Sequence, residues 1–412
     1  MAKALYLTQD GITDHIGQAQ IAPYILGLAR EGHEIHVVSC EKPGRHALKA
    51  KYQQLFEEVG VKWTYVRYAN KPPLISSFWT MWHMYRAARR VAREQGPDII
   101  HCRAYLPLEV AIRLKREFGA KLLVDFRDFW ADVGIEKKPF KFVYRYLKDR
   151  EPEYICAADH IVTLTERAAR ILLDWYPTAV GGRRENYTVI PCCADFRHFD
   201  PERVDAALVA AHREELRLGD GPVLLYLGSI GHDYLLHEML LTFRQLLSLR
   251  PSARFLFVSN NVPRDMEKQV TRAGIPLEAI RCASVDRVHV PEYIALADLS
   301  VVFIRPTLSK AGCSPTKLAE LFASNVPVIA NTGVGDLDEI IQYEVNGSVI
   351  VSDFASETLR GAVQQVLDLP DVRRRSIRAA SRGFTLEEGI FRYMTVYDRL
   401  APPVSSAARA VA

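Results

Sequence analysis

The stretch SPTKLAELFASNVPVIANTGVGD, which spans Ser314–Asp336, places a helix, a strand and a glycine-rich turn one after another. Ser314 is a favourable N-cap and Pro315 suits the first helical position, so the sequence predicts a helix that starts here and continues through Thr316. The apolar run VPVIA predicts a buried strand, and TGVGD predicts a turn at its end. A helix that leads directly into a buried strand is typical of a parallel α/β sheet.

Lys317 lies in the first turn of this predicted helix, where the helix dipole disfavours a cation. The free N–H groups of a helix N-terminus bind phosphate, and a bound anion would make a lysine favourable there. Glu320 shares a face with Lys317, and its carboxylate could accept hydrogen bonds from a pair of sugar hydroxyls. A second interpretation stays open, in which the two residues form an ordinary ion pair on the surface of a capped helix.

Short apolar runs alternate with helical patterns along the whole chain of 412 residues, which is too long for one ordinary core. This alternation predicts an α/β protein with two doubly wound parallel sheets, in Rossmann-like domains that face each other across a cleft. The predicted strands are ALYLT, EIHVVS, VKWTYV, DIIHC, KLLVDF, HIVTLT and YTVIP in the first half, and GPVLLYLGS, ARFLFVSNN, AIRCASV, ADLSVVFIRP and VPVIANTG in the second.

A charged, helical connector around 205–218 separates the two sets of strands. We therefore expect a first domain at 1–203 and a second domain at 204–385. A helix at 386–400 is expected to cross back to the first domain, and the Pro-, Ser- and Ala-rich tail at 401–412 is expected to be flexible.

Composition and charge restrict the function. Residues 1–200 contain 30 Lys and Arg against 24 Asp and Glu, whereas the remaining residues contain 23 against 25, so the first half favours acidic partners. The seven cysteines form no Cys-x-x-Cys pair, which argues for a reduced compartment and against a structural zinc site. The N-terminus lacks the pattern of a signal peptide and no apolar run could cross a bilayer, so we expect a cytoplasmic protein.

Several loops that follow strands carry candidate binding residues, because ligands of doubly wound sheets bind beyond the carboxyl ends of the strands. Gly228 and Ser229 follow the first strand of the second domain, and the long loop after the first strand of the chain contains Gly17 and Gln18. A histidine and several carboxylates follow two neighbouring strands of the first domain, among them His101 and Asp128. No Gly-x-Gly-x-x-Gly and no Walker lysine is present, which argues against a dinucleotide dehydrogenase and a P-loop NTPase.

With these motifs together, the chain resembles the GT-B glycosyltransferases, specifically the bacterial glycosyl transferases group 1, family 4. The resemblance covers nearly the whole chain and rests on LYLTQDGITDHIGQAQ, LGSIG, ADLSVVFIRP and SPTKLAELFASNVPVIANTGVGD. It implies that Glu320 binds the ribose of a nucleoside-diphosphate sugar and that Ser314, Pro315, Thr316 and Lys317 lie near its diphosphate. It also implies that Gly17 approaches the donor phosphates and that His101 lies beside the transferred sugar. Gln18 and Asp128, in the same loops, are expected to join them.

The chain departs from the family pattern at two places. The first of two glutamates usually present in the family is replaced by Gly312, and the usual Arg and Lys pair after the first strand of the second domain is missing. Arg305, Lys310 and Lys317 are the cations that could neutralise the diphosphate instead. No Asp-x-Asp motif occurs, so we expect that neither a metal nor any cofactor other than the donor substrate is required.

The resemblance implies transfer of a sugar to a glycan or lipid-linked acceptor, mostly with retention, in polysaccharide or glycolipid assembly. Two alternatives stay open: a sugar-nucleotide epimerase of the same fold, and a non-catalytic partner that binds sugar nucleotide, which Gly312 would favour. No nucleic acid partner is expected.

Two basic, aromatic stretches at 72–94 and 137–150 suggest peripheral binding of the first domain to an anionic membrane. The alternative is that their aromatic side chains pack into the core of the domain.

Overall fold

The computed structural model describes residues 1–69, 71–72, 75–137 and 140–402, and the chain divides into two compact units. The first unit contains Met1–Pro191 together with Leu386–Ala412, and the second contains Cys192–Thr385. Of the predicted flexible tail, residues 403–412 lie outside the described residues.

The boundary predicted at residue 203 is wrong, because the segment 192–203 is bound to the second unit. The backbone N–H of Cys192 donates to Ser314 Oγ at 3.1 Å. The backbone N–H of Ala194 donates to the carbonyl of Phe384 at 3.0 Å. Composition alone does not reveal these bonds, since the segment contains no helix or strand pattern of its own.

The first unit contains a seven-stranded parallel sheet in the order β3-β2-β1-β4-β5-β6-β7. Each of its strands coincides with a predicted run. The strands are β1 Lys3–Thr8, β2 Glu34–Glu41, β3 Lys62–Arg67, β4 Ile99–Arg103, β5 Lys121–Phe126, β6 His160–Thr163 and β7 Tyr187–Val189. The doubly wound order places the carboxyl ends of all seven strands at one edge.

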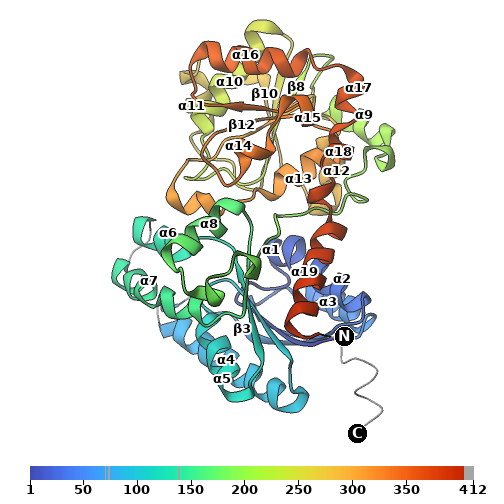
Figure 1. Cartoon of the computed structure of the whole chain (residues 1–412). Helices are drawn as coiled ribbons and strands as arrows, with labels where there is room; N and C mark the ends of the chain where they lie inside the picture. Colours follow the sequence, from blue (N-terminus) through green and yellow to red (C-terminus); the bar gives the residue numbers. More distant parts are fainter. Residues whose placement is uncertain (70, 73–74, 138–139, 403–412) are drawn as a thin grey trace. The chain divides into compact units, whose positions relative to one another are not determined.

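Helices cover both faces of this sheet and lie around it in Figure 1. They are α1 His15–Gln20, α2 Ala22–Arg30, α3 His46–Glu57, α4 Ile75–Gln95, α5 Leu108–Phe118, α6 Trp130–Lys137, α7 Lys141–Cys156, α8 Glu166–Trp175 and α19 Leu386–Leu400. Short 3-10 turns occupy Ala179–Gly182 and Arg184–Asn186.

The second unit contains a six-stranded parallel sheet in the order β10-β9-β8-β11-β12-β13. Its strands are β8 Val223–Leu227, β9 Arg254–Val258, β10 Ile280–Ala283, β11 Leu299–Val302, β12 Val328–Asn331 and β13 Val349–Val351. The sequence predicts five of them and misses β13, which has three residues and too short an apolar run to stand out.

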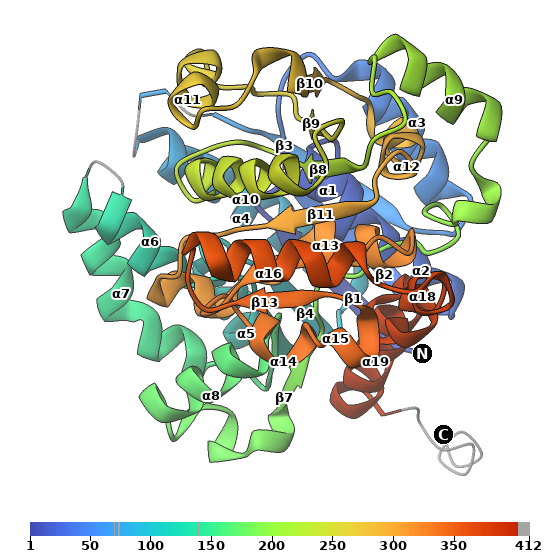
Figure 2. The ribbon, with the colours of Figure 1, turned by 90° about the horizontal axis from the view of Figure 1, so that it is seen from above.

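The helices of the second unit lie on both faces of its sheet, with α10 beside α16 on one face (Figure 2). They are α9 Ala206–Glu215, α10 Leu236–Leu249, α11 Met266–Arg272, α12 Val290–Ile294, α13 Thr316–Ala323, α14 Leu337–Ile340, α15 Tyr343–Asn346, α16 Ser356–Leu367, α17 Asp371–Arg374 and α18 Ile377–Ala380. Short 3-10 turns occupy Pro201–Arg203, Leu277–Ala279, Arg287–His289, Leu308–Gly312 and Arg382–Phe384.

Strand β8 shows why the second sheet is buried on both faces. Leu225 and Leu227 pack in one apolar cluster, whereas Leu224 and Tyr226 pack in the other. Successive side chains of a strand point to opposite faces, so a continuous apolar run is what a sheet covered by helices on both sides requires.

Helix α19 returns the chain to the first unit. It packs against α2, where a Cβ built at Gly27 would lie 2.2 Å from the Ile390 side chain, so only glycine permits this approach. Tyr393 and Tyr397 of α19 are buried against the sheet. Helix α19 therefore contributes side chains to the same core as the first strands of the chain.

Candidate functional site

Lys317, on the first turn of α13, is held between two tyrosine rings at the carboxyl edge of the second sheet. Its Nζ lies 4.1 Å from the ring centroid of Tyr226 and 4.5 Å from that of Tyr234. Gly228, directly after β8, faces the same atom, since a Cβ built there would lie 3.2 Å from Lys317 Nζ. Gly228 has a φ of 111°, which favours glycine.

The ammonium of Lys317 is buried and has no hydrogen-bond acceptor among the described residues. Burial lowers the pKa of Lys317 to about 7, although Glu320 and Cys313 act to raise it. Tyrosine rings attract a cation but accept no strong hydrogen bond from it. The arrangement therefore leaves a desolvated donor that an anion beside Gly228 would satisfy.

Glu320 does not pair with Lys317, although the two share a helical face. Instead, Arg287 places its Nη1 2.9 Å from Glu320 Oε1. The Glu320 side chain is 7% exposed, and the Arg287 guanidinium also lies over the ring of Phe199 at 5.8 Å. The alternative of a surface ion pair between Lys317 and Glu320 is wrong, because both residues are buried and each has a different neighbour.

The helix start differs from the prediction by one residue. Pro315, not Ser314, occupies the N-cap of α13, and no side chain caps the helix. Ser314 Oγ instead accepts the hydrogen bond from the N–H of Cys192. Thr316 is the first helical residue, so Lys317 lies second in the helix, close to the free N–H groups.

The other cations predicted near the diphosphate follow β11. Lys310 Nζ lies 3.0 Å from Asp233 Oδ2. Burial acts to lower the pKa of Lys310, but the hydrogen bond and the charge of Asp233 outweigh it and raise that pKa. The exposed Arg305 donates its backbone N–H to the carbonyl of Asp233 at 2.8 Å. The backbone carbonyl of the exposed Ser229 accepts from Tyr226 Oη at 2.6 Å.

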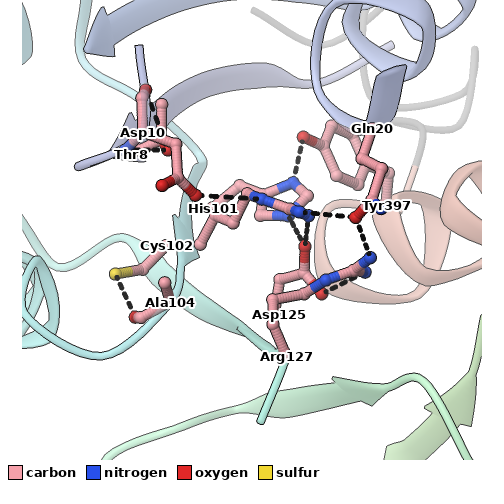
Figure 3. Close-up of polar contacts among 10 residues, drawn as sticks. Thr8, Asp10, Gln20, His101, Cys102, Ala104, Asp125, Arg127 and Tyr397 are labelled. Atoms are coloured by element: carbon pink, nitrogen blue, oxygen red, sulfur yellow. Dashed lines mark hydrogen bonds and ion pairs between the residues drawn. The ribbon is translucent and has the colours of Figure 1, made fainter. Parts of the chain in front are cut away.

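His101, in the middle of β4, belongs to a buried polar cluster in the first unit (Figure 3). Its Nδ1 lies 2.9 Å from Tyr397 Oη of α19, and its Nε2 lies 4.0 Å from Asp125 Oδ2. The ring of Tyr6 packs against it with centroids 4.4 Å apart. Burial lowers the pKa of His101 to about 4, so the imidazole is neutral near pH 7.

Asp125, on β5, is completely buried and holds two arginines beside this histidine (Figure 3). Arg103 Nη1 lies 3.0 Å from its Oδ2 and Arg127 Nη1 lies 3.1 Å from its Oδ1. Gln20 Oε1 accepts from both guanidinium groups at 3.1 Å. Burial acts to raise the pKa of Asp125, but the two arginines outweigh it and lower that pKa.

The glycine of the first loop has a packing role within its own unit. A Cβ built at Gly17 would lie 2.0 Å from the carbonyl oxygen of Gly11 and 2.6 Å from the Cα of Ile12. Gln18 closes the same loop by donating from Nε2 to the carbonyl of Thr13 at 3.0 Å. Asp128 follows β5 and is half-buried.

Sequence reasoning missed several residues of these sites, among them Tyr226, Tyr234, Arg287 and Tyr397. The tyrosines of the second unit stand next to the LGSIG loop, which is the only signal that could have found them. Arg287 and Tyr397 are distant in sequence from the residues that they contact, so no local pattern connects them. The predicted roles of His101, Asp128, Gly17 and Gln18 toward the donor sugar stay predictions.

Among the described ranges, no group of three or more His, Cys, Asp or Glu side chains could hold a metal ion. No helix within the same part of the chain is long and apolar enough to cross a membrane.

Two family models match the chain in succession. Residues 18–193 match the glycosyl transferase 4-like domain, and residues 221–368 match the glycosyl transferases group 1 domain. Together the two matches cover most of both units, and they confirm the resemblance drawn from the sequence motifs.

Solved structures share the fold at low sequence identity. Alr3699/HepE from Anabaena, in complex with UDP and glucose, has a TM-score of 0.69 at 15% identity, covering 96% of this chain and 99% of its own. Sucrose-phosphate synthase from Thermosynechococcus elongatus has a TM-score of 0.68 at 17% identity, covering 97% of this chain and 99% of its own. These likenesses confirm the GT-B fold class.

A putative UDP-N-acetylglucosamine 2-epimerase from Listeria monocytogenes is also similar, with a TM-score of 0.62 at 13% identity over 96% of each chain. The fold alone therefore does not separate transferases from epimerases. A comparison with curated protein sequences found no match.

Proposed function

Because the chain belongs to the group 1 glycosyltransferases of the GT-B fold, we propose that it moves a sugar from a nucleoside diphosphate to the hydroxyl of a glycan or lipid-linked acceptor. We propose further that transfer retains the anomeric configuration and serves polysaccharide or glycolipid assembly.

The observation that carries the donor part of this proposal is the environment of Lys317. A buried ammonium without a hydrogen-bond acceptor, beside a glycine and the N-terminus of α13, is a site that a diphosphate would complete. We assign Glu320, one turn further along the same helix, to accept hydrogen bonds from the ribose hydroxyls, and its ion pair with Arg287 would hold the carboxylate in position. UDP in the solved Alr3699/HepE structure supports a nucleotide ligand for this fold.

In the proposed reaction, the bond between the anomeric carbon and the diphosphate oxygen breaks, and a bond to the acceptor oxygen forms. Negative charge grows on the departing diphosphate as its bond breaks, and the proton of the acceptor hydroxyl passes to that diphosphate. Lys317 and the N–H groups of α13 stabilise that charge, and Lys310 adds a second cation nearby. We assign this work to protein cations and propose that a divalent metal is not required.

On the acceptor side, the proposal assigns Asp128 and His101 to the surroundings of the transferred sugar. The side chain of His101 is 2% exposed and is bound to Tyr397, so within this proposal it positions Asp125 and its two arginines. Asp128 is half-buried at the end of β5. It is the better placed of the two predicted residues to meet a ligand.

We also propose that the first unit binds anionic membranes peripherally. Aromatic side chains of α4 and α7 are exposed to solvent rather than packed into the core, with Phe78 77%, Trp82 44% and Phe142 65% exposed. Arginines follow these aromatic residues along α4, which is the composition of a helix that rests on a charged bilayer. Vesicle flotation at low and high salt tests this part, since electrostatic attachment weakens with salt.

Two other functions compete with transfer. The first is a sugar-nucleotide epimerase, which hydrates the donor without an acceptor, and a similar structure is described as a putative epimerase. The second is a protein that binds sugar nucleotide without turning it over, which Gly312 in the family's glutamate position favours.

Nucleotide release from UDP-, GDP- and ADP-sugars, measured with and without membrane extract as acceptor source, separates the three. Release that depends on acceptor supports transfer, release without it supports hydration, and binding without release supports the partner role.

A further inference from the structure

We propose that the first half of α4 divides one acceptor site into two parts, and that this site takes an amphiphilic anion. Its phosphate enters a basic pocket on one side of the helix and its apolar chain enters a groove on the other. This inference rests on the proposed function, because it names the class of acceptor: a lipid phosphate rather than a neutral glycan.

The basic pocket lies beyond the carboxyl ends of β2 and β3 and has a volume of about 820 Å³. Four cationic side chains line it. Lys42, Arg45 and Lys71 come from the loops that follow these two strands, and Arg67 is the last residue of β3. Tyr68 adds an aromatic wall, with Lys42 Nζ 5.9 Å from its ring centroid.

The carboxylate beside the pocket compensates only part of this charge. Asp14 pairs with Lys42 at 3.0 Å and with Arg45 at 2.8 Å. Among the described residues, the side chains of Arg67 and Lys71 have no ion-pair or hydrogen-bond partner, and both residues are exposed. Two cations thus face a solvent-filled hollow without an anion, which favours a phosphate as ligand.

The apolar groove lies between α4, α5 and α7, which are close together in the first unit (Figure 1), and has a volume of about 380 Å³. It is lined mainly by aromatic and aliphatic side chains, including Phe78, Met81, Trp82, Leu106 and Tyr146. These side chains line the groove and stay open to solvent, with Phe78 77% and Trp82 44% exposed. A hydrocarbon chain bound in the groove would remove their apolar area from water, which favours binding.

Both parts are built by the same two turns of α4. Ile75, Ser76 and Trp79 line the basic pocket, and Trp79 lies four residues after Ile75 and three after Ser76, spacings that bring side chains of a helix together. Phe78, Met81 and Trp82 line the groove from the neighbouring face, at spacings of three and four residues. An α-helix with its side chains is about 10–12 Å across, so one lipid phosphate can occupy both parts at once.

The position of α4 connects this site with the proposed chemistry. The helix follows β3, so its first turns lie at the carboxyl edge of the first sheet, the edge that also carries Asp128 after β5. A membrane surface alone would cover exposed aromatic residues, but it would fill neither the basic pocket nor the groove. We therefore assign the two hollows to a single ligand molecule.

The test measures binding of three probes to the full-length protein by calorimetry: dodecyl phosphate below its micelle concentration, methyl phosphate and dodecyl maltoside. The first has both chemical features, and each of the others has one. We expect dodecyl phosphate to bind about tenfold or more tightly than either of the others. Equal binding of dodecyl phosphate and dodecyl maltoside would overturn the anion part, and equal binding of both phosphates would overturn the chain part.

Two pairs of variants locate the site. Arg67→Glu/Lys71→Glu should weaken binding of both phosphates about tenfold and leave dodecyl maltoside unchanged. Met81→Asn/Trp82→Ser should weaken binding of dodecyl phosphate and dodecyl maltoside only. Matched controls on exposed residues away from both hollows, Arg30→Glu/Lys51→Glu and Phe391→Ser, should change none of the three. If the controls act like the tested pairs, the assignment to α4 is wrong.

The same proteins are assayed for binding of UDP, GDP and ADP, which separates this inference from the proposed function. Wild-type protein that binds dodecyl phosphate but no nucleotide would contradict the transferase proposal and keep an amphiphile site. Nucleotide binding without dodecyl phosphate binding would contradict only the inference made here. Free phosphate as the true ligand would appear as methyl phosphate binding as tightly as dodecyl phosphate.

Discussion

The ammonium of Lys317 lies 4.1 Å from the ring centroid of Tyr226 and has no hydrogen-bond acceptor among the described residues. A cation between aromatic rings is attracted to them, but loss of its water is not compensated by rings alone. The fold therefore tolerates this buried cation, and an anion bound beside it would compensate the water that Lys317 has lost. Binding and stability should therefore respond in opposite directions when this lysine is removed.

Replacing Lys317 by Met should abolish the charge while keeping most of the side-chain volume. We expect nucleoside-diphosphate binding to weaken by roughly 1.5–3 kcal/mol, the range for a hydrogen bond to a charged group. The variant should also unfold at a higher temperature, because a desolvated charge is removed from the fold. Calorimetry and thermal unfolding test both effects, with Lys268→Met on the exposed face of α11 as control. A variant that binds as tightly as wild type would contradict the donor assignment.

The protonation of Lys317 should couple to donor binding. Its pKa is about 7 in the unliganded fold, against 10.5 ordinarily, and a bound diphosphate would raise it again. Binding therefore takes up a proton above pH 7, and affinity should fall by up to about tenfold per pH unit between pH 7 and 9. Titrations at pH 8 in two buffers with different ionisation enthalpies measure that uptake. Proton uptake that persists in Lys317→Met would assign it to another group.

The lowered pKa of Lys317 also predicts how the unfolding free energy changes with pH. The unfolded chain holds the Lys317 proton more tightly than the folded chain, so the lysine costs most stability below pH 7. The cost should shrink as pH rises from 7 toward 10, and the difference in unfolding free energy between Lys317→Met and wild type should shrink with it.

Glu320 should make the protein bind ribonucleotides more tightly than deoxyribonucleotides. If its carboxylate accepts hydrogen bonds from the ribose hydroxyls, wild type should prefer a nucleoside diphosphate over its 2′-deoxy form. Glu320→Gln should reduce this preference, with a loss of roughly 1.5–3 kcal/mol for the ribose compound alone. Calorimetry with the tightest binder among UDP, GDP and ADP, and with its deoxy analogue, gives both numbers. Equal losses for both compounds would show that Glu320 acts only through its ion pair with Arg287.

His101 should make the first unit sensitive to acid. Its folded pKa of about 4 lies below the ordinary 6.5, so the unfolded state binds more protons between these values. Its contribution to stability is complete above pH 6.5 and is lost as pH falls toward 4, at up to about 1.4 kcal/mol per pH unit. His101→Gln should reduce the slope of unfolding free energy against pH by about one proton. Tyr397→Phe keeps the histidine and should keep most of that slope while lowering stability at all pH values.

Replacing Gly17 and Gly361 by alanine should change the stability of the protein in opposite directions. Gly17→Ala should destabilise the first unit by several kcal/mol, because its Cβ would overlap the carbonyl of Gly11 at 2.0 Å. Gly361→Ala, within α16 and with no neighbouring atom within 4 Å, should stabilise the second unit by about 0.5–1 kcal/mol. Chemical denaturation measures both. A Gly17→Ala protein with unchanged stability would mean that the first loop can move away, and the predicted contact with donor phosphates would then be the better reason for this glycine.

The sequence by itself determined the two doubly wound sheets, because an apolar run of five or six residues between helices can be satisfied only by a strand buried on both faces. It also determined which helix carries Lys317 and Glu320. These features depend on neighbours in the chain. The three-residue strand β13 is too short to produce such a pattern.

Only the tertiary structure decided what surrounds each charge. Ser314 was predicted to cap its own helix, but its hydroxyl accepts from Cys192, which is 122 positions away in the chain. Glu320 meets Arg287 instead of Lys317, and His101 meets Tyr397, which is 296 positions away in the chain. The physical reason is that a buried polar group must find a partner wherever packing brings one, and packing brings together residues whose separation in sequence carries no information.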